Sequence, residues 1–350
     1  MFPKIFTPRW YSADKNTPID RTNFEAVVAE VAKDSTPPQS AKLEEVSWGY
    51  PYGDALVDAD GLVPLLLRSW TKKLPRNTMK AMLKQKIEQF KAENDDMPAA
   101  PRRVVAAFKE EIEKELAAKQ VPELREVYVL VNMNNGDFLI NEASAIKADD
   151  MLDHVYDLLD KVYLDMGGRR PSYTRDSSLD HRVMAMQPND EPEGTRPYLN
   201  WVLDAAAKVF EVKDKHGEVH KVEFRIDDKV KLTTSMQTKV SVSGAEACAI
   251  ASTNIEKDNP SQLEEMGFTV IYTGQDDLTL EWSLTMTSVG EWKRVKFPEA
   301  LATDDSDSTF GELLFRISNV SRAALLYDLF AACYVLDELK GGALCRYELV

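Results

Sequence analysis

The segment 68–91, RSWTKKLPRNTMKAMLKQKIEQFK, concentrates positive charge in an otherwise acidic chain. It holds eight Lys or Arg residues and one acid, a net charge of +7. The 350 residues together carry −15, so the rest of the chain carries −22. An acidic protein that gathers cations into one short segment is expected to present them to an anionic partner. The alternative is a solvated helix face whose lysines only aid solubility.

Hydrophobic spacing predicts that most of this segment is a helix. Pro75 suits a helix start, and residues 76–91 follow it with apolar side chains three and four positions apart. The predicted apolar face consists of Met79, Met82, Leu83, Ile87 and Phe90. The cations beside that face are Lys80, Lys84 and Lys91, with Arg76 at its border. Lys86 falls within the apolar arc, so it must extend toward solvent or meet an acid.

A second helix is predicted to start at Pro101 and to run to about residue 119. Its core spacing comes from Val104, Val105, Phe108, Ile112 and Leu116. The residues NDDMPAAP between the two helices have the composition of a linker. Two helices joined in this way form an antiparallel hairpin over 76–119, on the order of 25 Å long from the rise of 1.5 Å per residue.

The remaining sequence indicates an α+β fold with antiparallel β-hairpins and no Rossmann alternation or internal repeat. Hairpins are predicted within 45–67, 127–143 and 210–226, and strands at 269–273, 279–287 and 292–297. Helices are predicted at 22–33 with Thr22 as N-cap, at 148–164, at 260–265 and at 322–339. The turn-rich segment 167–197 is the expected boundary between an N-terminal domain, 1–166, and a C-terminal domain, 198–350.

Composition favours a soluble globular protein in the cytoplasm. Hydrophobic residues make up 44% and charged residues 29% of the chain, which suits packed domains rather than disorder. No apolar run is long enough to span a membrane, and residues 1–16 lack the apolar core of a signal peptide. The cysteines show no metal-ligand spacing and are read as reduced thiols; they are Cys248, Cys333 and Cys345.

Several short matches, in order along the chain, resemble the RdgC family of recombination-associated DNA-binding proteins. The basic segment contributes Arg68, Lys72, Leu74, Pro75, Lys80, Leu83, Lys86 and Ile87. Upstream lie Asp54, Ala55 and Leu56, followed by Gly61. Downstream lie Ala143, Ser144, Ala145, Lys147, Ala148, Asp150 and Leu152, and later the strand WKRVKF at 292–297.

The resemblance implies a homodimer, joined head-to-head and tail-to-tail into a closed ring around double-stranded DNA. In that family the bound protein limits the access of RecA recombinase to DNA, so a nucleoid-associated protein of a prokaryotic or infected prokaryotic cell is implied. The family has an aromatic residue at the gate of the ring, where this chain has Val121 after a basic Lys119. Residues 165–240 also depart from the family pattern, as a divergent, phage-borne member would.

The candidate DNA-binding residues are cations, which contact phosphates without reading bases. They are Arg68, Lys72, Lys73, Arg76, Lys80, Lys84, Lys91, Lys119, Lys293, Arg294 and Lys296. Strand alternation places Arg294 and Lys296 on one face with Trp292, and Lys293 on the other with Val295 and Phe297, so Lys293 is the weaker candidate. Five to seven neutralised phosphates would give a slope of log affinity against log salt of about −5 to −6.

Enzyme signatures are weak, and no catalytic residue, cofactor or metal is predicted. Glu211-Val212-Lys213 after Asp204 has the acid-x-Lys pattern of a metal-dependent nuclease, but it falls in a predicted exposed hairpin. His216 and His220 are predicted to be surface histidines. Two other functions stay open: a metal-dependent DNA exonuclease, and an acidic DNA mimic that inhibits a host DNA enzyme.

Overall fold

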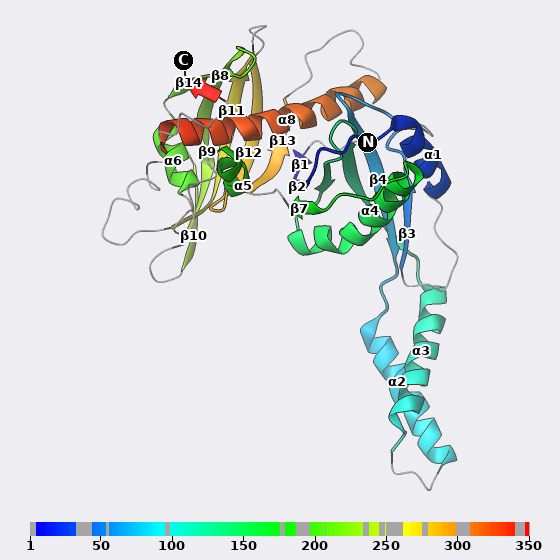
Figure 1. The fold of residues 1–350 in the computed structure, drawn as a ribbon. Coiled ribbons are helices and arrows are strands. Elements are labelled where there is room, and N and C mark those ends of the chain that lie inside the picture. The colour runs from blue at the N-terminus through cyan, green and yellow to red at the C-terminus, as the bar shows by residue number, and fades with distance from the viewer. Residues whose placement is uncertain are drawn as a thin grey trace. The chain divides into compact units, whose positions relative to one another are not determined.

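The computed structural model has the α+β fold expected from the sequence, with antiparallel sheets, packed helices and one helical hairpin (Figure 1). The residues that it describes are 5–32, 44–53, 56–94, 99–175, 179–186, 197–206, 208–233, 238–244, 249, 262–274, 279–298, 309–339 and 347–349. Several predictions fall outside them, including those for Asp54, Ala55, Cys248 and Cys345.

One sheet has eight antiparallel strands in the order β1-β13-β12-β11-β9-β8-β14, with β10 pairing β9. Alternation explains its strands, because the buried Phe210, Val212, Val222 and Phe224 take every second position. The strands are β1 (Ile5–Phe6), β8 (Val209–Asp214), β9 (Val219–Thr233), β10 (Lys239–Ser243), β11 (Gln262–Thr273), β12 (Thr279–Thr287), β13 (Trp292–Lys296) and β14 (Tyr347–Leu349).

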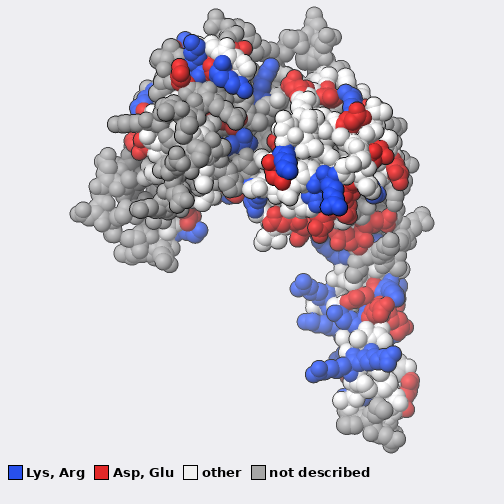
Figure 2. All heavy atoms as spheres, viewed as in Figure 1, with Lys and Arg blue, Asp and Glu red and all other residues white. Residues whose placement is uncertain are grey.

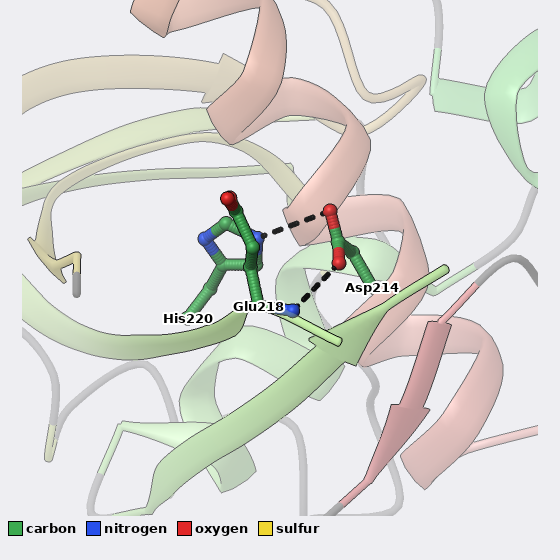
Figure 3. Close-up of side chains that lie close together, drawn as sticks. All are labelled: Asp214, Glu218 and His220. Atoms are coloured by element: carbon green, nitrogen blue, oxygen red, sulfur yellow. Dashed lines mark hydrogen bonds and ion pairs between the residues drawn. The ribbon is translucent and has the colours of Figure 1, made fainter. Parts of the chain in front are cut away.

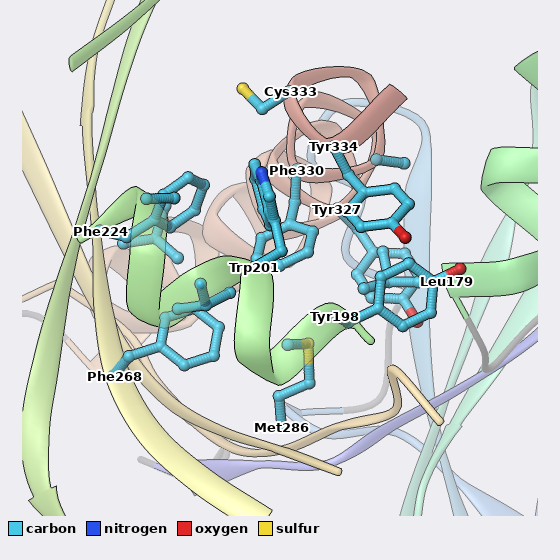
Figure 4. Close-up of a cluster of buried hydrophobic side chains, with 14 of the residues drawn as sticks. Leu179, Tyr198, Trp201, Phe224, Phe268, Met286, Tyr327, Phe330, Cys333 and Tyr334 are labelled. Carbon is cyan, nitrogen blue, oxygen red and sulfur yellow. The ribbon is translucent and has the colours of Figure 1, made fainter. Parts of the chain in front are cut away.

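An aromatic core packs three helices against this sheet (Figure 4). Trp201 lies at its centre, with ring centroids 5.5 Å from Phe224, 5.2 Å from Phe330 and 5.4 Å from Tyr334. Its indole Nε1 donates to Asp337 at 2.9 Å, so the buried donor is satisfied. The helices are α5 (Leu179–Met186), α6 (Tyr198–Ala205) and α8 (Thr309–Asp337).

The second sheet has six strands in the order β3-β4-β5-β6-β2-β7. The turn between β5 and β6 requires Gly136, whose φ is 81° and whose absent Cβ would lie 2.6 Å from the carbonyl oxygen of Thr17. The strands are β2 (Pro8–Ala13), β3 (Glu44–Gly49), β4 (Leu62–Thr71), β5 (Glu123–Asn132), β6 (Phe138–Asn141) and β7 (Tyr173–Arg175), and the accompanying helices are α1 (Arg21–Val31) and α4 (Ala145–Asp165).

The predicted helical hairpin is present and consists of α2 (Arg76–Glu93) and α3 (Arg102–Lys119). A proline is the N-cap of each helix, Pro75 for α2 and Pro101 for α3, as the sequence indicates. The hairpin follows β4 in the chain and leads into β5, so both of its ends are attached to neighbouring strands of one sheet.

The chain divides into two compact units. The first comprises residues 1–27, 51–64 and 129–350, and the second comprises 28–50 and 65–128, which include the helical hairpin. The predicted boundary segment 167–197 lies inside the first unit, and the division into 1–166 and 198–350 stays a prediction.

Three local predictions are wrong. The helix expected at 260–265 is not formed at 262–265, because Gln262 begins β11 and pairs with β9. The N-cap of α1 is Asp20, not Thr22, since the Asp20 carboxylate accepts the Asn23 amide at 3.0 Å. Strict alternation also fails in β13, where both Trp292 and Val295 are buried. A bulge at Arg294, whose φ is 52°, adds a residue and shifts the pattern.

A buried charge network ties strands of both sheets together inside the first unit. The Arg9 guanidinium on β2 is 4% exposed, and its Nη1 lies 2.9 Å from Glu291, which precedes β13. Arg9 also donates to the carbonyl oxygens of Glu142 at 3.2 Å and Ala143 at 2.8 Å. Arg175 reaches the same Glu291 oxygen at 3.4 Å. Every charged group in this network therefore has an opposite charge or a backbone acceptor.

Replacing Glu291 by Ala should destabilise the protein by about 3 kcal/mol, because it leaves the buried Arg9 charge without its carboxylate. Urea unfolding measures the loss. The control is Glu281→Ala, which removes an exposed partner of Arg225 and should change stability by less than about 1 kcal/mol. Equal losses in the two variants would show that Arg9 does not depend on Glu291.

Candidate nucleic-acid interface

An apolar seam between α2 and α3 sets the direction of their charged side chains. Ile112 and Leu116 of α3 are buried, and the rings of Phe90 and Phe108 meet edge to face with centroids 6.1 Å apart. The five predicted apolar positions of α2 are all half-buried, which confirms the predicted face. The cations of α2 outside this seam consequently point to solvent.

Lys86 is the one α2 cation that lies in the predicted apolar arc, and of the two outcomes left open for it, solvent or an acidic partner, the structure shows the second. Its Nζ lies 2.5 Å from a carboxylate oxygen of Glu111 on α3. It also lies 5.6 Å from the centroid of the Phe108 ring, within the range of a cation–π interaction. Lys86 therefore joins the two helices and contributes little free charge.

The four glutamates of α3 are each paired with a lysine. The pairs are Glu110–Lys114 at 2.7 Å, Glu111–Lys86 at 2.5 Å, Glu113–Lys109 at 3.7 Å and Glu115–Lys119 at 2.6 Å. Hydrogen bonds from Lys114 and Lys119 lower the pKa values of Glu110 and Glu115, respectively, so these carboxylates stay charged below the ordinary range for glutamate. The predicted DNA contact Lys119 thus already has a partner.

Helix α2 keeps its positive charge. Arg76, Lys80 and Lys91 are exposed and have no ion pair among the described residues. Lys84 reaches Glu88 only at 3.8 Å, with both side chains more than half exposed. From Arg76 to Lys91 this cation stripe, formed by these two residues with Lys80 and Lys84, runs about 22 Å along the helix. Figure 2 shows the hairpin with Lys and Arg gathered along one edge.

Two exposed arginines at the start of α3 were not among the predicted site residues. Arg102 and Arg103 follow Pro101 and have no ion pair within the described part of the chain. A pair of arginines in a first helical turn is the signal that could have identified them, because nearby backbone N–H groups add positive potential at that position. They extend the set of unpaired cations to the second helix of the hairpin.

The predicted contacts at the base of the hairpin have partners within the protein. Arg68 is 14% exposed and lies 2.9 Å from Glu126. Lys72 donates to the Ala117 carbonyl oxygen at 2.9 Å, and Lys73 lies 2.5 Å from Glu123. Arg68 thus joins β4 to β5, Lys72 joins the end of β4 to α3, and Lys73 contacts the start of β5. Any DNA contact by these three side chains stays a prediction.

The second predicted basic group lies on β13, in the other compact unit. Arg294 and Lys296 are exposed, whereas Lys293 is less exposed and lies 3.3 Å from Glu265. The bulge explains the orientation of Arg294, whose backbone amide donates to Thr7 Oγ1 at 3.2 Å. The ranking of Arg294 and Lys296 above Lys293 agrees with this exposure, although the alternation used to derive it is wrong.

Val121, the predicted gate residue, is 85% exposed just after α3. Exposure of that extent leaves its side chain available to a second copy of the chain.

A possible nuclease triad does not form around Glu211, but metal-capable side chains do meet nearby. Glu211 lies 3.1 Å from Lys221, on the strand face opposite the buried Val212. The one group of potential metal ligands within the described residues is Asp214, Glu218 and His220 (Figure 3). His220 is only 5% exposed, so its prediction as a surface histidine is wrong; β9 turns it inward beside Tyr272.

Exposed cations without acidic partners, gathered on one helical hairpin of an α+β protein, are typical of proteins that bind nucleic acid through its phosphates. The comparison with known families agrees: a family model described as "Putative exonuclease, RdgC" matches residues 9–169, which include the hairpin. The match covers less than half of the chain, and the similarity of residues 9–169 to the RdgC family supports a DNA-related role. No curated protein matches the chain. No helix in the described ranges is long and apolar enough to cross a membrane.

Proposed function

We propose that this protein binds double-stranded DNA through the phosphate backbone, without sequence preference and without catalysis. The observation that carries the proposal is the difference in ion pairing between the side chains of α2 and those of α3. Each glutamate of α3 is paired with a lysine, whereas Arg76, Lys80 and Lys91 of α2 have no acidic partner among the described residues. Unpaired cations release counterions from DNA, which is the main source of nonspecific affinity.

The dimensions of the cation stripe support backbone contact. B-DNA carries one charge per about 1.7 Å of its axis, so the roughly 22 Å of the stripe faces on the order of a dozen phosphates. Lysine and arginine on flexible stems can reach several of them without a fixed register. Arg294 and Lys296 form a separate exposed basic group and are proposed as further contacts.

We expect duplex DNA of any sequence to bind with a salt slope of about −5 to −6, because binding neutralises five to seven phosphates. Replacing Lys80 and Lys91 by Gln should make the slope less negative by about 2 and weaken binding up to roughly 60-fold near 0.1 M salt. A salt-titrated gel shift measures both quantities.

The matched control replaces Lys109 and Lys114 by Gln in the same hairpin. This double variant has the same net charge change, but both lysines are paired with glutamates. Equal weakening by the two double variants would assign binding to overall charge and contradict the role of the stripe. The mass in solution, measured on the same preparation, tests the proposed homodimer: 39.5 kDa, the mass of one chain, would contradict it.

The implied biological effect is that bound protein limits the access of a RecA-type recombinase to DNA. The similarity of residues 9–169 to the RdgC family and the proposed backbone mode of binding support this part of the proposal. Strand exchange from a duplex preincubated with the protein should decrease, and the Lys80→Gln/Lys91→Gln variant should inhibit less. Equal inhibition by a variant that no longer binds DNA would point instead to direct contact with the recombinase.

The exonuclease alternative is favoured by the description of the family model, so it requires a direct test. Linear duplex DNA incubated with the protein and Mg²⁺ should remain intact, because Glu211 is occupied by Lys221 and no acids converge on it within the described residues. Degradation that EDTA blocks and Glu211→Ala abolishes would overturn the non-catalytic proposal.

A further inference from the structure

We propose that Asp214, Glu218 and His220 form a binding site for one divalent transition-metal ion, with Zn²⁺ as the expected occupant. The three residues lie on the β8–β9 hairpin, outside the residues 9–169 that match the family model. Their ligand atoms lie within 4.8 Å of one another. The site is independent of the proposed DNA contacts.

The decisive observation is the imidazole of His220. It is 95% buried, and its Nε2 has no hydrogen-bond partner among the described residues. The nearest carboxylate oxygen, Oδ2 of Asp214, lies 3.8 Å away, which is too far for a hydrogen bond. A buried nitrogen without a partner is costly, and a metal ion between Nε2 and the carboxylates removes that cost.

The other imidazole nitrogen is held in the way that metal-binding histidines require. Nδ1 lies 3.1 Å from the hydroxyl of Tyr272, and the two rings stack with centroids 5.9 Å apart. With the Nδ1 proton donated to that oxygen, the lone pair on Nε2 faces the two carboxylates. Tyr272 would then be a positioning residue that fixes the ring and its tautomer.

The turn between β8 and β9 holds the Asp214 carboxylate in place. Its Oδ1 accepts the backbone amides of His216 at 2.8 Å and Glu218 at 2.9 Å, which leaves Oδ2 facing His220 (Figure 3). Gly217, with φ of 85°, allows the chain to return tightly enough to bring Glu218 alongside.

The donor set selects the class of metal. One imidazole nitrogen and two carboxylate oxygens suit Zn²⁺ and its neighbours, whereas Mg²⁺ and Ca²⁺ prefer oxygen ligands throughout. Bonds of about 2.0–2.2 Å require the ligand atoms to close by about 1 Å. The exposed side chain of Glu218 can supply that movement. A water molecule would complete a four-coordinate site.

Titration of the metal-stripped, untagged full chain with ZnCl₂ in a calorimeter tests the site. We expect one Zn²⁺ per chain, and Glu218→Gln should raise the Kd at least tenfold because an anionic ligand becomes a neutral amide. Glu223→Gln, at an exposed position of β9, the strand that carries His220, should leave the Kd unchanged. Tyr272→Phe should raise it about tenfold, the usual cost of losing an outer-shell hydrogen bond.

Glu218 is exposed, so Glu218→Gln should fold. Circular dichroism of Glu218→Gln and of the control Glu223→Gln verifies that each variant is folded. Co²⁺ substitution adds a spectroscopic readout, since cysteine-bound Co²⁺ shows an intense sulfur charge-transfer band that this site should lack. Equal Zn²⁺ affinity in Glu218→Gln and Glu223→Gln, a sulfur band, or no saturable binding would each overturn the proposal. DNA binding by Glu218→Gln should stay normal, which separates this test from that of the proposed function.

Discussion

The contact between Arg9 and Glu291 is the constraint on which the first compact unit depends. The two residues are 282 positions apart in the chain of 350, yet their side chains meet at 2.9 Å with the guanidinium buried. Desolvating a guanidinium is expensive, and the arrangement is tolerable only because Glu291 and two carbonyl oxygens surround it. Such a pair penalises any packing that separates β2 from the start of β13. It therefore acts through specificity of the fold more than through added stability.

In the helical hairpin, the order of the charged residues along each helix affects how closely they pair. Glu110 and Glu115 each precede their lysine by four residues, and those contacts are 2.7 and 2.6 Å long. In Lys84–Glu88 and Lys109–Glu113 the lysine comes first, and the contacts lengthen to 3.8 and 3.7 Å. The first order is the more favourable one on a helix. Helix α3 therefore neutralises itself well, whereas α2, which has fewer acids, cannot.

Sequence reasoning succeeded where one local rule decides the structure. Helical spacing and Pro75 were enough to place α2 and its apolar face, and they limited Lys86 to solvent or an acidic partner, of which the structure has the second. It failed where a non-local contact decides. The bulge at Arg294 depends on pairing with β12, and the burial of His220 depends on Tyr272, more than fifty residues away in the chain. Ion-pair partners such as Glu123 for Lys73 could not be predicted from the sequence either, because exposure and ion pairing depend on which strands are neighbours in the folded sheet.

Local pairing, rather than net charge, decides whether an acidic protein can hold DNA. At physiological ionic strength a charge is screened beyond about 8 Å, so the −22 carried outside residues 68–91 acts weakly on a phosphate near α2 unless its acids lie adjacent. Among the described residues, the four glutamates of α3 are each paired with a lysine, whereas Glu93 hydrogen-bonds to the neutral amide of Gln89 and keeps its charge. Arg76 and Lys80, at the other end of α2 from Glu93, therefore contribute the positive potential that is least offset by acids. An acidic remainder even favours specificity of placement, because it repels DNA from every surface except the one where cations are unpaired.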